Sequence, residues 1–281
     1  MLDIAACMVI RDDVYYVDMA IKSVLPFIKG IYIQDQLSVD GSYEKLLEMQ
    51  KGEHGERIFV ERVNTETPVR FHPNYNEPHF RTLALKRAEE VFKPAWVLKI
   101  DADDCFTEYF FKRLEGLLAG NPKFEGVCVS GDRPISKEYW GTNGVNQFGI
   151  THWSPEGGRF ADAHTQLWKA GKYYYFNNPT LPGSMFHPIL RPNPDPVYWL
   201  PGLCNFHLHR TFGPKAIQFW HEGHDLYGLD EVIDDSKPLY PPTSCPKWFN
   251  HPINMGTAEK RDFNWPPYIL EKWAAWEAGI W

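Results

Sequence analysis

The sequence lacks long hydrophobic runs and a surplus of basic residues, and each absence excludes a class of protein. No apolar run reaches the roughly 18 residues that a membrane-spanning helix needs, so no such helix is predicted. Basic residues are outnumbered, with 29 Lys and Arg against 36 Asp and Glu and a formal net charge of −7. Proteins that bind duplex nucleic acid normally present a basic surface that displaces counterions. Nucleic acid is therefore disfavoured as a partner, although the net charge leaves room for a local basic patch.

The sequence also lacks paired cysteines. Its five cysteines are odd in number, widely spaced and never arranged as CxxC, which favours buried thiols in a reducing compartment over disulfides. The apolar segment Met1–Ile10 contains Asp3 and no basic leader, so it is predicted to be a strand rather than a signal peptide. Together these features predict a cytoplasmic globular protein.

Strands and helices alternate over the first 105 residues. Apolar runs predict strands at 2–10, 31–33, 58–63 and 96–100, and helical spacing of apolar residues predicts helices at 14–25, 43–50 and 81–92. Gly30 is expected to end the first helix. This alternation implies right-handed crossovers and a parallel sheet. Ligands of such sheets bind beyond the carboxyl ends of the strands, where Arg11, Asp35 and Asp101 are expected to meet.

A pair of carboxylates, Asp101 and Asp103, follows the fourth predicted strand. Carboxylates two residues apart can bind one hard cation, and magnesium or manganese prefers such ligands together with phosphate oxygens. The competing interpretation is that acidic residues after a strand only cap the next helix, and Asp104 or Thr107 is expected to do so here.

Several motifs occur together in one order over residues 2–118. They are Val9–Asp13 followed by Ser23–Phe27, then Gln34–Ser42, Phe80–Ala84 and Trp96–Asp104. In this order they resemble the motifs of the family 2 glycosyltransferases with the GT-A fold, which use activated nucleotide sugars. The combination is far more specific than a bare DxD motif, and it favours metal binding over helix capping.

The resemblance implies a role for each matching residue. Asp35 would accept a hydrogen bond from the nucleobase, and Arg11 would lie against that base. Arg81 would pair with the diphosphate, for which its planar guanidinium is suited. Asp101 would contact the ribose or the metal, and Asp103 the metal itself. Taken singly, Asp35 could equally be a turn former and Arg81 a solvated helix residue.

The catalytic base is harder to assign. Many members of this family place a His-Glu pair where this chain has Asn178–Pro182, which contains no carboxylate. An inverting transfer needs a carboxylate or imidazole facing the acceptor hydroxyl, so Asp162 is the preferred substitute. His164, Glu156 and His187 are its rivals, and a structural role for Asp162 is nearly as plausible.

Aromatic and histidine residues gather late in the chain. His207 and His209 alternate on a predicted strand, and the resemblance favours His207 as a further metal or diphosphate ligand; a core histidine is the competing interpretation. In the tail, Ile269, Trp273 and Trp276 share one helical face, which predicts core packing or a dimer seam. Trp140 and Trp153, expected in loops, are the better candidates for contact with a sugar.

The predicted fold is α/β, a GT-A-type Rossmann-like mixed sheet flanked by helices, with a Trp- and Pro-rich C-terminal extension. Residues 1–125 would form the nucleotide-sugar-binding half, 126–215 the acceptor-side half and 216–281 the extension. The predicted activity is metal-dependent transfer, with inversion, from a UDP- or GDP-linked sugar to a glycan or small-molecule hydroxyl, with Mn²⁺ or Mg²⁺ as cofactor.

Three alternatives stay open at this stage. A sugar-phosphate nucleotidyltransferase would share sheet and metal, but it would normally carry a Gly-rich loop where this chain has Arg11-Asp12-Asp13. A non-catalytic carbohydrate-binding protein would suit the Trp-rich second half and would not need Asp101 and Asp103. An enzyme that glycosylates modified DNA bases fits the main prediction, but the net charge argues against it.

Overall fold

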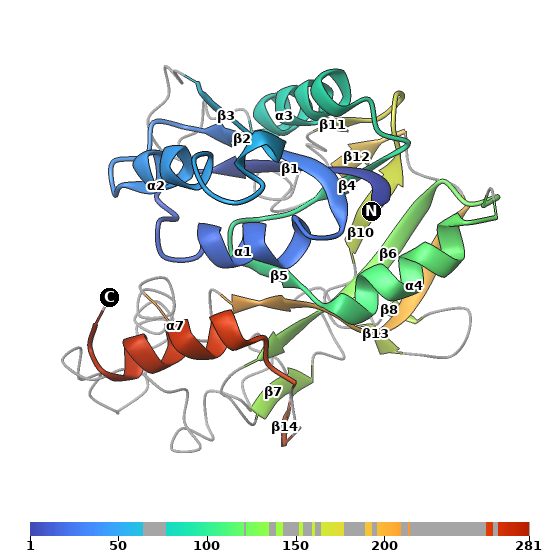
Figure 1. The fold of residues 1–281 in the computed structure, drawn as a ribbon. Coiled ribbons are helices and arrows are strands. Elements are labelled where there is room, and N and C mark those ends of the chain that lie inside the picture. Colours follow the sequence, from blue (N-terminus) through green and yellow to red (C-terminus); the bar gives the residue numbers. More distant parts are fainter. Residues whose placement is uncertain are drawn as a thin grey trace. The chain divides into compact units, whose positions relative to one another are not determined.

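The computed structural model describes residues 1–63, 77–120, 122–134, 139–142, 152–153, 159–160, 164–176, 189–192, 196–208, 213, 257–260 and 264–280 (Figure 1). The chain divides into two compact units. Unit 1 comprises Met1–Ala102, Phe111–Cys128 and Thr165–Tyr198, and unit 2 comprises Asp103–Phe110, Val129–His164 and Trp199–Trp281.

The sheet of unit 1 confirms the predicted parallel strands. They are β1 (Leu2–Ile10), β2 (Ile28–Asp35), β3 (Ile58–Arg62) and β4 (Trp96–Lys99), which lie in the order β4-β1-β2-β3. The pairs β1–β2, β1–β4 and β2–β3 are all parallel, and β10 (His164–Lys169) adds an antiparallel strand to β4. The architecture is therefore a mixed α/β sheet flanked by helices, as predicted.

Three helices connect these parallel strands. They are α1 (Val17–Val24), α2 (Ser42–Met49) and α3 (Glu77–Phe92). The first two crossovers run from β1 towards β3, and the third returns to the far side of β1, so right-handed connections require α3 to cover the opposite face (Figure 1). The apolar face of α3 packs into a buried cluster with one face of the sheet, formed by Cys7, Tyr32, Ala84, Leu85, Ala88, Val97, Trp168 and Tyr173. The strand order changes direction between β1 and β4, which is where sheets of this kind bind ligands.

Two predicted boundaries are wrong for reasons of packing. Gly30 does not end a helix, because α1 stops at Val24 and Gly30 lies inside β2. A Cβ atom at Gly30 would lie 2.2 Å from Cε1 of Phe92 and 2.6 Å from the carbonyl oxygen of Arg57, so the glycine allows Phe92 and the backbone of Arg57 to approach β2. Helix α3 begins at Glu77 rather than at Arg81, one turn earlier than predicted.

The described residues of unit 2 include short antiparallel strand pairs and helix α7. Strand β5 (Asp104–Phe106) pairs with β13 (Val197–His207), and β7 (Tyr139–Thr142) pairs with β14 (Thr257–Lys260). Helix α7 (Pro267–Glu277) buries Ile269, Trp273 and Trp276, which confirms the predicted packing face. The ring of Trp265 packs against that of Trp273, with their centroids 5.3 Å apart.

The remaining elements complete the described chain. They are η1 (Gly55–Arg57), α4 (Glu108–Leu118), β6 (Gly126–Pro134), β8 (His152–Trp153), β9 (Arg159–Phe160), β11 (Tyr174–Phe176) and β12 (Ile189–Arg191). Thr107 caps α4, since its Oγ1 accepts a hydrogen bond from the backbone N of Phe110 at 3.3 Å. Asp104, the other expected cap, lies in β5 instead.

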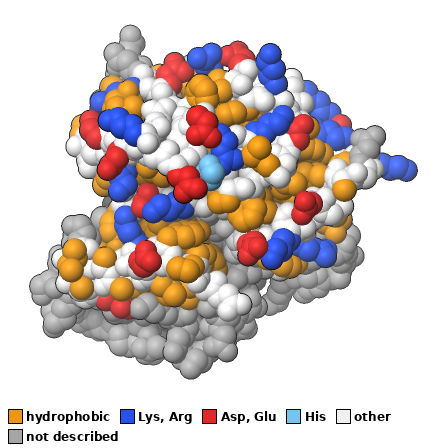
Figure 2. Space-filling view, viewed as in Figure 1, with side chains coloured by type: hydrophobic (Ala, Val, Ile, Leu, Met, Phe, Trp, Pro, Cys, Tyr) orange, Lys and Arg blue, Asp and Glu red, His pale blue; other side chains and the backbone are white. Residues whose placement is uncertain are grey.

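Two expectations from composition can be compared with the described residues. None of the described helices is both long and apolar enough to cross a membrane. Cys7, Cys105, Cys128 and Cys204 are buried free thiols, and burial raises the pKa of Cys7 and of Cys128 to about 12. Acidic and basic side chains are interspersed on the described part of the face drawn in Figure 2.

Candidate functional site

The turns that follow β1 and β2 are tied together by side chains bonded to backbone. The backbone N of Asp12 donates to Oγ of Ser38 at 2.9 Å, and the backbone N of Val39 donates back to Oδ1 of Asp12 at 2.8 Å. Oδ2 of Asp40 accepts the backbone N of Val14 at 2.9 Å. These bonds hold the two turns as one surface at the carboxyl ends of β1 and β2.

Asp35 lies beneath this surface with none of its side chain exposed. Its carboxylate accepts the backbone N of Ser38, at 3.4 and 3.3 Å to its two oxygens, and Nε of Arg62 lies 3.3 Å from Oδ2. Burial raises the pKa of Asp35, and the bonds from Ser38 and the charge of Arg62 oppose that rise. In this conformation the carboxylate of Asp35 binds the backbone of Ser38 and the side chain of Arg62, and it does not face solvent.

Arg62 is the residue of this surface that sequence reasoning missed. Its guanidinium lies 4.7 Å from the centre of the Tyr43 ring, and Nη2 donates to the carbonyl oxygen of Ser38 at 2.7 Å. The position carried a signal, because Arg62 ends β3 and pairs in register with Asp35 at the end of β2. Because the carboxyl ends of parallel strands meet at one edge of a sheet, this position places Arg62 at the same edge as Arg11 and Asp101.

Arg11 lies at the end of the neighbouring strand. Its Nε is 3.8 Å from Oδ2 of Asp12, and its backbone N donates to Oδ2 of Asp13 at 3.3 Å. Among the described residues, the buried Nη1 of Arg11 has no hydrogen-bond partner. The residue therefore keeps one unused donor at the predicted mouth of the sheet.

A second cluster joins the first turn of α3 to the end of β4. Nε of Arg81 donates to Oε1 of Glu77 at 2.7 Å, and Nη1 donates to Oδ1 of Asp101 at 3.0 Å. The other oxygen of Asp101, Oδ2, pairs with Nζ of Lys99. The structure thus brings Arg81, to which the resemblance assigned the diphosphate, next to Asp101 at the end of β4, and adds Glu77 and Lys99.

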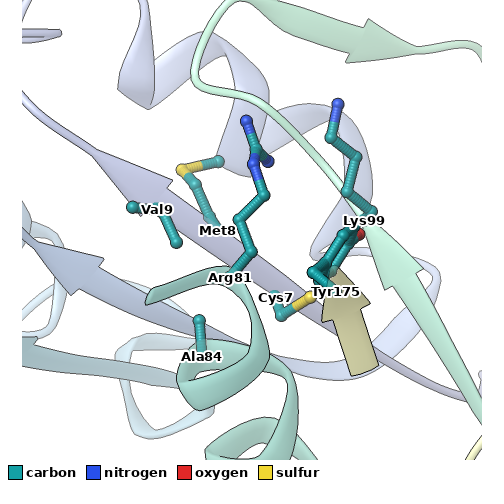
Figure 3. Close-up of a pocket in the computed structure, with 7 residues that line it drawn as sticks. All are labelled: Cys7, Met8, Val9, Arg81, Ala84, Lys99 and Tyr175. Carbon is teal, nitrogen blue, oxygen red and sulfur yellow. The ribbon is translucent and has the colours of Figure 1, made fainter. Parts of the chain in front are cut away.

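The second cluster opens onto a pocket between β1, β4, α3 and β11 (Figure 3). Its lining is formed by Cys7, Met8, Val9, Arg81, Ala84, Lys99 and Tyr175. Burial alone would lower the pKa of Arg81, but the charges of Asp101 and Glu77 raise it well above its usual value, so the guanidinium stays charged. Burial likewise raises the pKa of Tyr175, so its phenol stays neutral. The pocket lies where the strand order changes direction, between β1 and β4.

The other predicted metal residues belong to unit 2. The carbonyl oxygen of Asp103 accepts the backbone N of Leu208 at 2.8 Å, and His207 pairs in register with Asp104. The backbones of Asp103 and His207 are therefore neighbours at the ends of β5 and β13. The described residues contain no group of three or more His, Cys, Asp or Glu side chains placed to hold a metal ion.

Several predicted residues lie outside the described residues. These are Asp162, Glu156, His187 and His209, as well as the segment 178–182. His164 lies in β10. Trp140 and Trp153 lie in strands β7 and β8 rather than in loops, which corrects their predicted setting.

Comparison with known proteins returned structural likenesses only. No protein-family model matches the chain, and no curated protein sequence matches it significantly. Among solved structures, residues 1–349 of S. aureus TarS align with 84% of this chain and 68% of that one, at 12% identity and a TM-score of 0.47. A longer TarS structure aligns at the same identity over 41% of its own length.

Two further solved structures align with about half of the chain. A mannosyltransferase from Pyrobaculum calidifontis, in complex with GDP-Man and Mn²⁺, aligns over 47% of this chain and 36% of its own at 11% identity and a TM-score of 0.34. Glucosyl-3-phosphoglycerate synthase from Mycobacterium tuberculosis, with Mn²⁺, UDP and glucosyl-3-phosphoglycerate, aligns over 46% and 43% at 20% identity and a TM-score of 0.31. The chain spans less than half of either protein.

Proposed function

We propose that this chain is a metal-dependent glycosyltransferase that moves a sugar from a UDP- or GDP-linked donor to a hydroxyl acceptor with inversion. The observation that carries the proposal is the pairing of Arg81 with Asp101 beside the switch between β1 and β4. Both residues lie in the motifs that resemble those of family 2 glycosyltransferases. A glycan or a small molecule is the proposed acceptor.

The donor diphosphate is proposed to bind at Arg81. A guanidinium can donate two parallel hydrogen bonds to phosphoryl oxygens, and such charged bonds are about twice as strong as neutral ones. Arg81 is largely buried, with 13% of its side chain exposed, so its charge is weakly screened by solvent. Glu77 accepts a hydrogen bond from Nε of Arg81, and Nη1 at the outer edge of the guanidinium is directed at Asp101.

The nucleoside is proposed to bind over the turns after β1 and β2. Asp35 would recognise the base and Arg11 would lie against it, and Arg11 offers the unpartnered Nη1 described above. Because Asp35 is buried under Ser38 and Arg62, a direct bond to the base requires the Arg62 side chain to move. Arg62 is 35% exposed and is held by one ion pair, one hydrogen bond and the ring of Tyr43.

A divalent cation, Mn²⁺ or Mg²⁺, is proposed to be held by Asp101, Asp103 and His207. The carboxylate oxygens of Asp101 and Asp103 are the ligand type that such a hard cation prefers, and the imidazole of His207 would be a softer third ligand. The cation would supply neutralisation of the charge that develops on the departing diphosphate. Each oxygen of Asp101 already pairs with a cation, Oδ1 with Arg81 and Oδ2 with Lys99, so a metal ion would share or replace these partners.

The metal proposal is tested with Asp103→Asn. We expect this variant to lose manganese-dependent donor hydrolysis and the manganese-dependent rise in unfolding temperature with UDP, each measured against the variant's own unfolding temperature without ligands, because Asp103 is buried. Glu108→Gln, at an exposed site in the first turn of α4, is the matched control and should keep both. Full manganese-dependent activity in Asp103→Asn would contradict the assignment.

The nucleotide proposal is tested by calorimetric titration of UDP and GDP. Arg81→Ala should weaken both nucleotides alike, whereas Asp35→Ala should reduce the discrimination between them, each lost charged hydrogen bond being worth ~1.5–3 kcal/mol. Unchanged affinities in both variants would reject this placement.

The catalytic base is proposed to be Asp162. Asp162→Asn should bind the donor normally and transfer it ~100- to 10,000-fold more slowly, because a general base acts on the chemical step. His164→Ala, Glu156→Gln and His187→Ala are the comparison variants. If one of these variants loses rate selectively while Asp162→Asn stays near wild type, the catalytic base is that residue rather than Asp162, and the transferase proposal still stands.

A further inference from the structure

Lys99 is a charged residue to which the sequence analysis assigned no role. It ends β4, pairs in register with Cys7 of β1, and keeps 18% of its side chain exposed. Together with Arg81 it lines the pocket at the switch between β1 and β4. In Figure 3 the side chains of Arg81 and Lys99 extend in the same direction, and their charged ends lie at the same end of the pocket.

One carboxylate keeps these two cations together. Oδ1 of Asp101 accepts Nη1 of Arg81 at 3.0 Å, and Oδ2 pairs with Nζ of Lys99. Glu77 pairs with Nε of Arg81 at 2.7 Å, so the members of the cluster named here, all within the described part of the chain, carry two positive and two negative charges. Two largely buried cations side by side repel each other unless an anion lies between them. Asp101 is that anion in the free protein.

We propose that Lys99 is a second diphosphate-binding cation and that Asp101 occupies the diphosphate position until the donor arrives. The inference rests on the proposed function, and it extends it to a residue that lies within the Trp96–Asp104 motif but has no role assigned by the resemblance. When the donor enters with its metal ion, Arg81 and Lys99 exchange the carboxylate for phosphoryl oxygens. Asp101 in turn exchanges the two cations for the metal ion, so every charge keeps a partner.

This exchange makes metal and diphosphate binding cooperative. Without a metal ion, an entering diphosphate meets the ionised carboxylate of Asp101 in the same small space and is repelled. With the ion bound to Asp101, that repulsion disappears, and by linkage the diphosphate strengthens metal binding by the same factor. The cooperativity between metal and UDP binding therefore depends on Asp101, whereas the affinity for the diphosphate depends on Arg81 and Lys99.

The test is calorimetric titration of UDP, UMP and inorganic diphosphate, with and without Mn²⁺, into variants of the full chain. Lys99→Met should weaken UDP and inorganic diphosphate by about 10- to 100-fold, the range for one charged hydrogen bond, and UMP by much less. Lys99→Arg should restore most of the affinity. Lys86→Met removes a lysine that pairs with Glu89 elsewhere on α3, and it should leave the affinities for UDP and inorganic diphosphate unchanged.

Asp101→Asn gives the second readout. We expect UDP to bind this variant more tightly than wild type when Mn²⁺ is absent, and Mn²⁺ to add little further affinity. A residue that only supports the fold would not strengthen binding when it is changed. Weaker metal-free UDP binding in Asp101→Asn would overturn the counter-ion role.

The remaining outcomes separate this inference from the proposed function. Wild-type affinity for UDP and inorganic diphosphate in Lys99→Met, with both lost in Arg81→Ala, overturns the role of Lys99 and leaves the transferase proposal standing. Lys99-dependent binding of inorganic diphosphate without binding of any nucleotide sugar rejects the transferase proposal and supports the anion site. If wild type binds neither UDP nor inorganic diphosphate, both proposals fail. Lys99→Gln replaces Lys99→Met if the latter does not fold.

Discussion

Gln34 shows how a single buried amide can reduce stability. Its side chain has no exposed surface, and among the described residues neither its Oε1 nor its Nε2 has a hydrogen-bond partner. A buried polar group without a partner has lost its bonds to water and regained none. It follows that an apolar side chain of similar shape is better suited to this position.

We expect Gln34→Met to raise the free energy of unfolding by ~1–3 kcal/mol, the usual cost of an unpartnered buried group. Gln50→Met is the matched control, because Nε2 of Gln50 donates to the carbonyl oxygen of Ile58 at 2.7 Å. That change should lower stability by ~1 kcal/mol. Urea unfolding followed by tryptophan fluorescence measures both, and equal shifts of the same sign would contradict the explanation.

The pKa of Asp35 makes a second prediction at this scale. Burial raises the pKa of the folded carboxyl above 3.8, its ordinary value, so the folded protein binds this proton more tightly than the unfolded chain. The stability contributed by this proton is present below pH 3.8 and is lost as the pH rises through the pKa of the folded state.

Asn cannot titrate, so the stability of wild type relative to Asp35→Asn should fall as the pH rises through that window and then level off. Denaturant unfolding of both proteins at a series of pH values from about 3 to 7 measures the difference. A difference that instead grows in favour of wild type would mean that the ion pair with Arg62 outweighs burial.

Residue types at the strand ends were visible in the sequence, but their partners were not. Strand order predicted that Asp101 lies at the mouth of the sheet and the resemblance assigned Arg81 to the diphosphate, but the 3.0 Å bond between their side chains was not predicted. The pairing of Asp35 with Arg62 depends on the register between β2 and β3. Register is set by packing across the whole sheet, so the sequence pattern did not reveal Arg62.

At the scale of the elements, Gly30 and Gly116 give opposite predictions for the same substitution. Gly30→Ala places a Cβ 2.2 Å from the Phe92 ring and 2.6 Å from the Arg57 carbonyl oxygen, which should cost ~1–3 kcal/mol or more through overpacking. Gly116 lies exposed in α4, and a Cβ there meets no atom within 4 Å.

Gly116→Ala should therefore stabilise the protein by ~0.5–1 kcal/mol, the difference in helix propensity between the two residues. Thermal unfolding should give a lower unfolding temperature than wild type for Gly30→Ala and a higher one for Gly116→Ala. If Gly30→Ala unfolds at the wild-type temperature, α3 does not pack on β2 as closely as the structure has it.

Apolar periodicity predicted the existence of the first elements but not their ends. Strand β1 and the buried face of α7 follow directly from the pattern of apolar residues. The pattern did not mark the end of α1 at Val24, and Gly30, which was expected to end that helix, instead lies in β2 next to Phe92. Pro78 was an available signal for the earlier start of α3, since proline is favoured in the first turn of a helix.

At the scale of the whole molecule, each compact unit is assembled from segments that are far apart in sequence. Unit 1 takes Thr165–Tyr198 from the second half of the chain, and unit 2 takes Asp103–Phe110 from the first. A change in amino-acid composition along the chain can only suggest boundaries between consecutive segments, so it could not reveal units that interleave segments from both halves. The interleaved segments are joined by pairings such as that between β10 and β4, whose long sequence separation leaves no local signal.

This division makes a prediction about unfolding. The residues proposed to bind the nucleoside and the diphosphate, Arg11, Asp35, Arg81, Lys99 and Asp101, all belong to unit 1. A ligand that binds only the folded state raises the free energy of unfolding by about 2.7 kcal/mol at 100 times its dissociation constant. Chains built from two compact units can unfold in separate transitions, and a ligand then shifts the transition of the unit that holds it.

We therefore expect metal-free UDP, added at a concentration high enough to overcome the repulsion from Asp101, to raise the unfolding temperature of one calorimetric transition and to slow amide exchange in β1, β2 and β4. Arg81→Ala should reduce both effects at the same UDP concentration, because it removes one of the proposed diphosphate contacts. Lys86→Met, on the same helix but paired with Glu89, should preserve both. Slower exchange confined to α7 and β13 would place the nucleotide in unit 2 and contradict the assignment of these five residues.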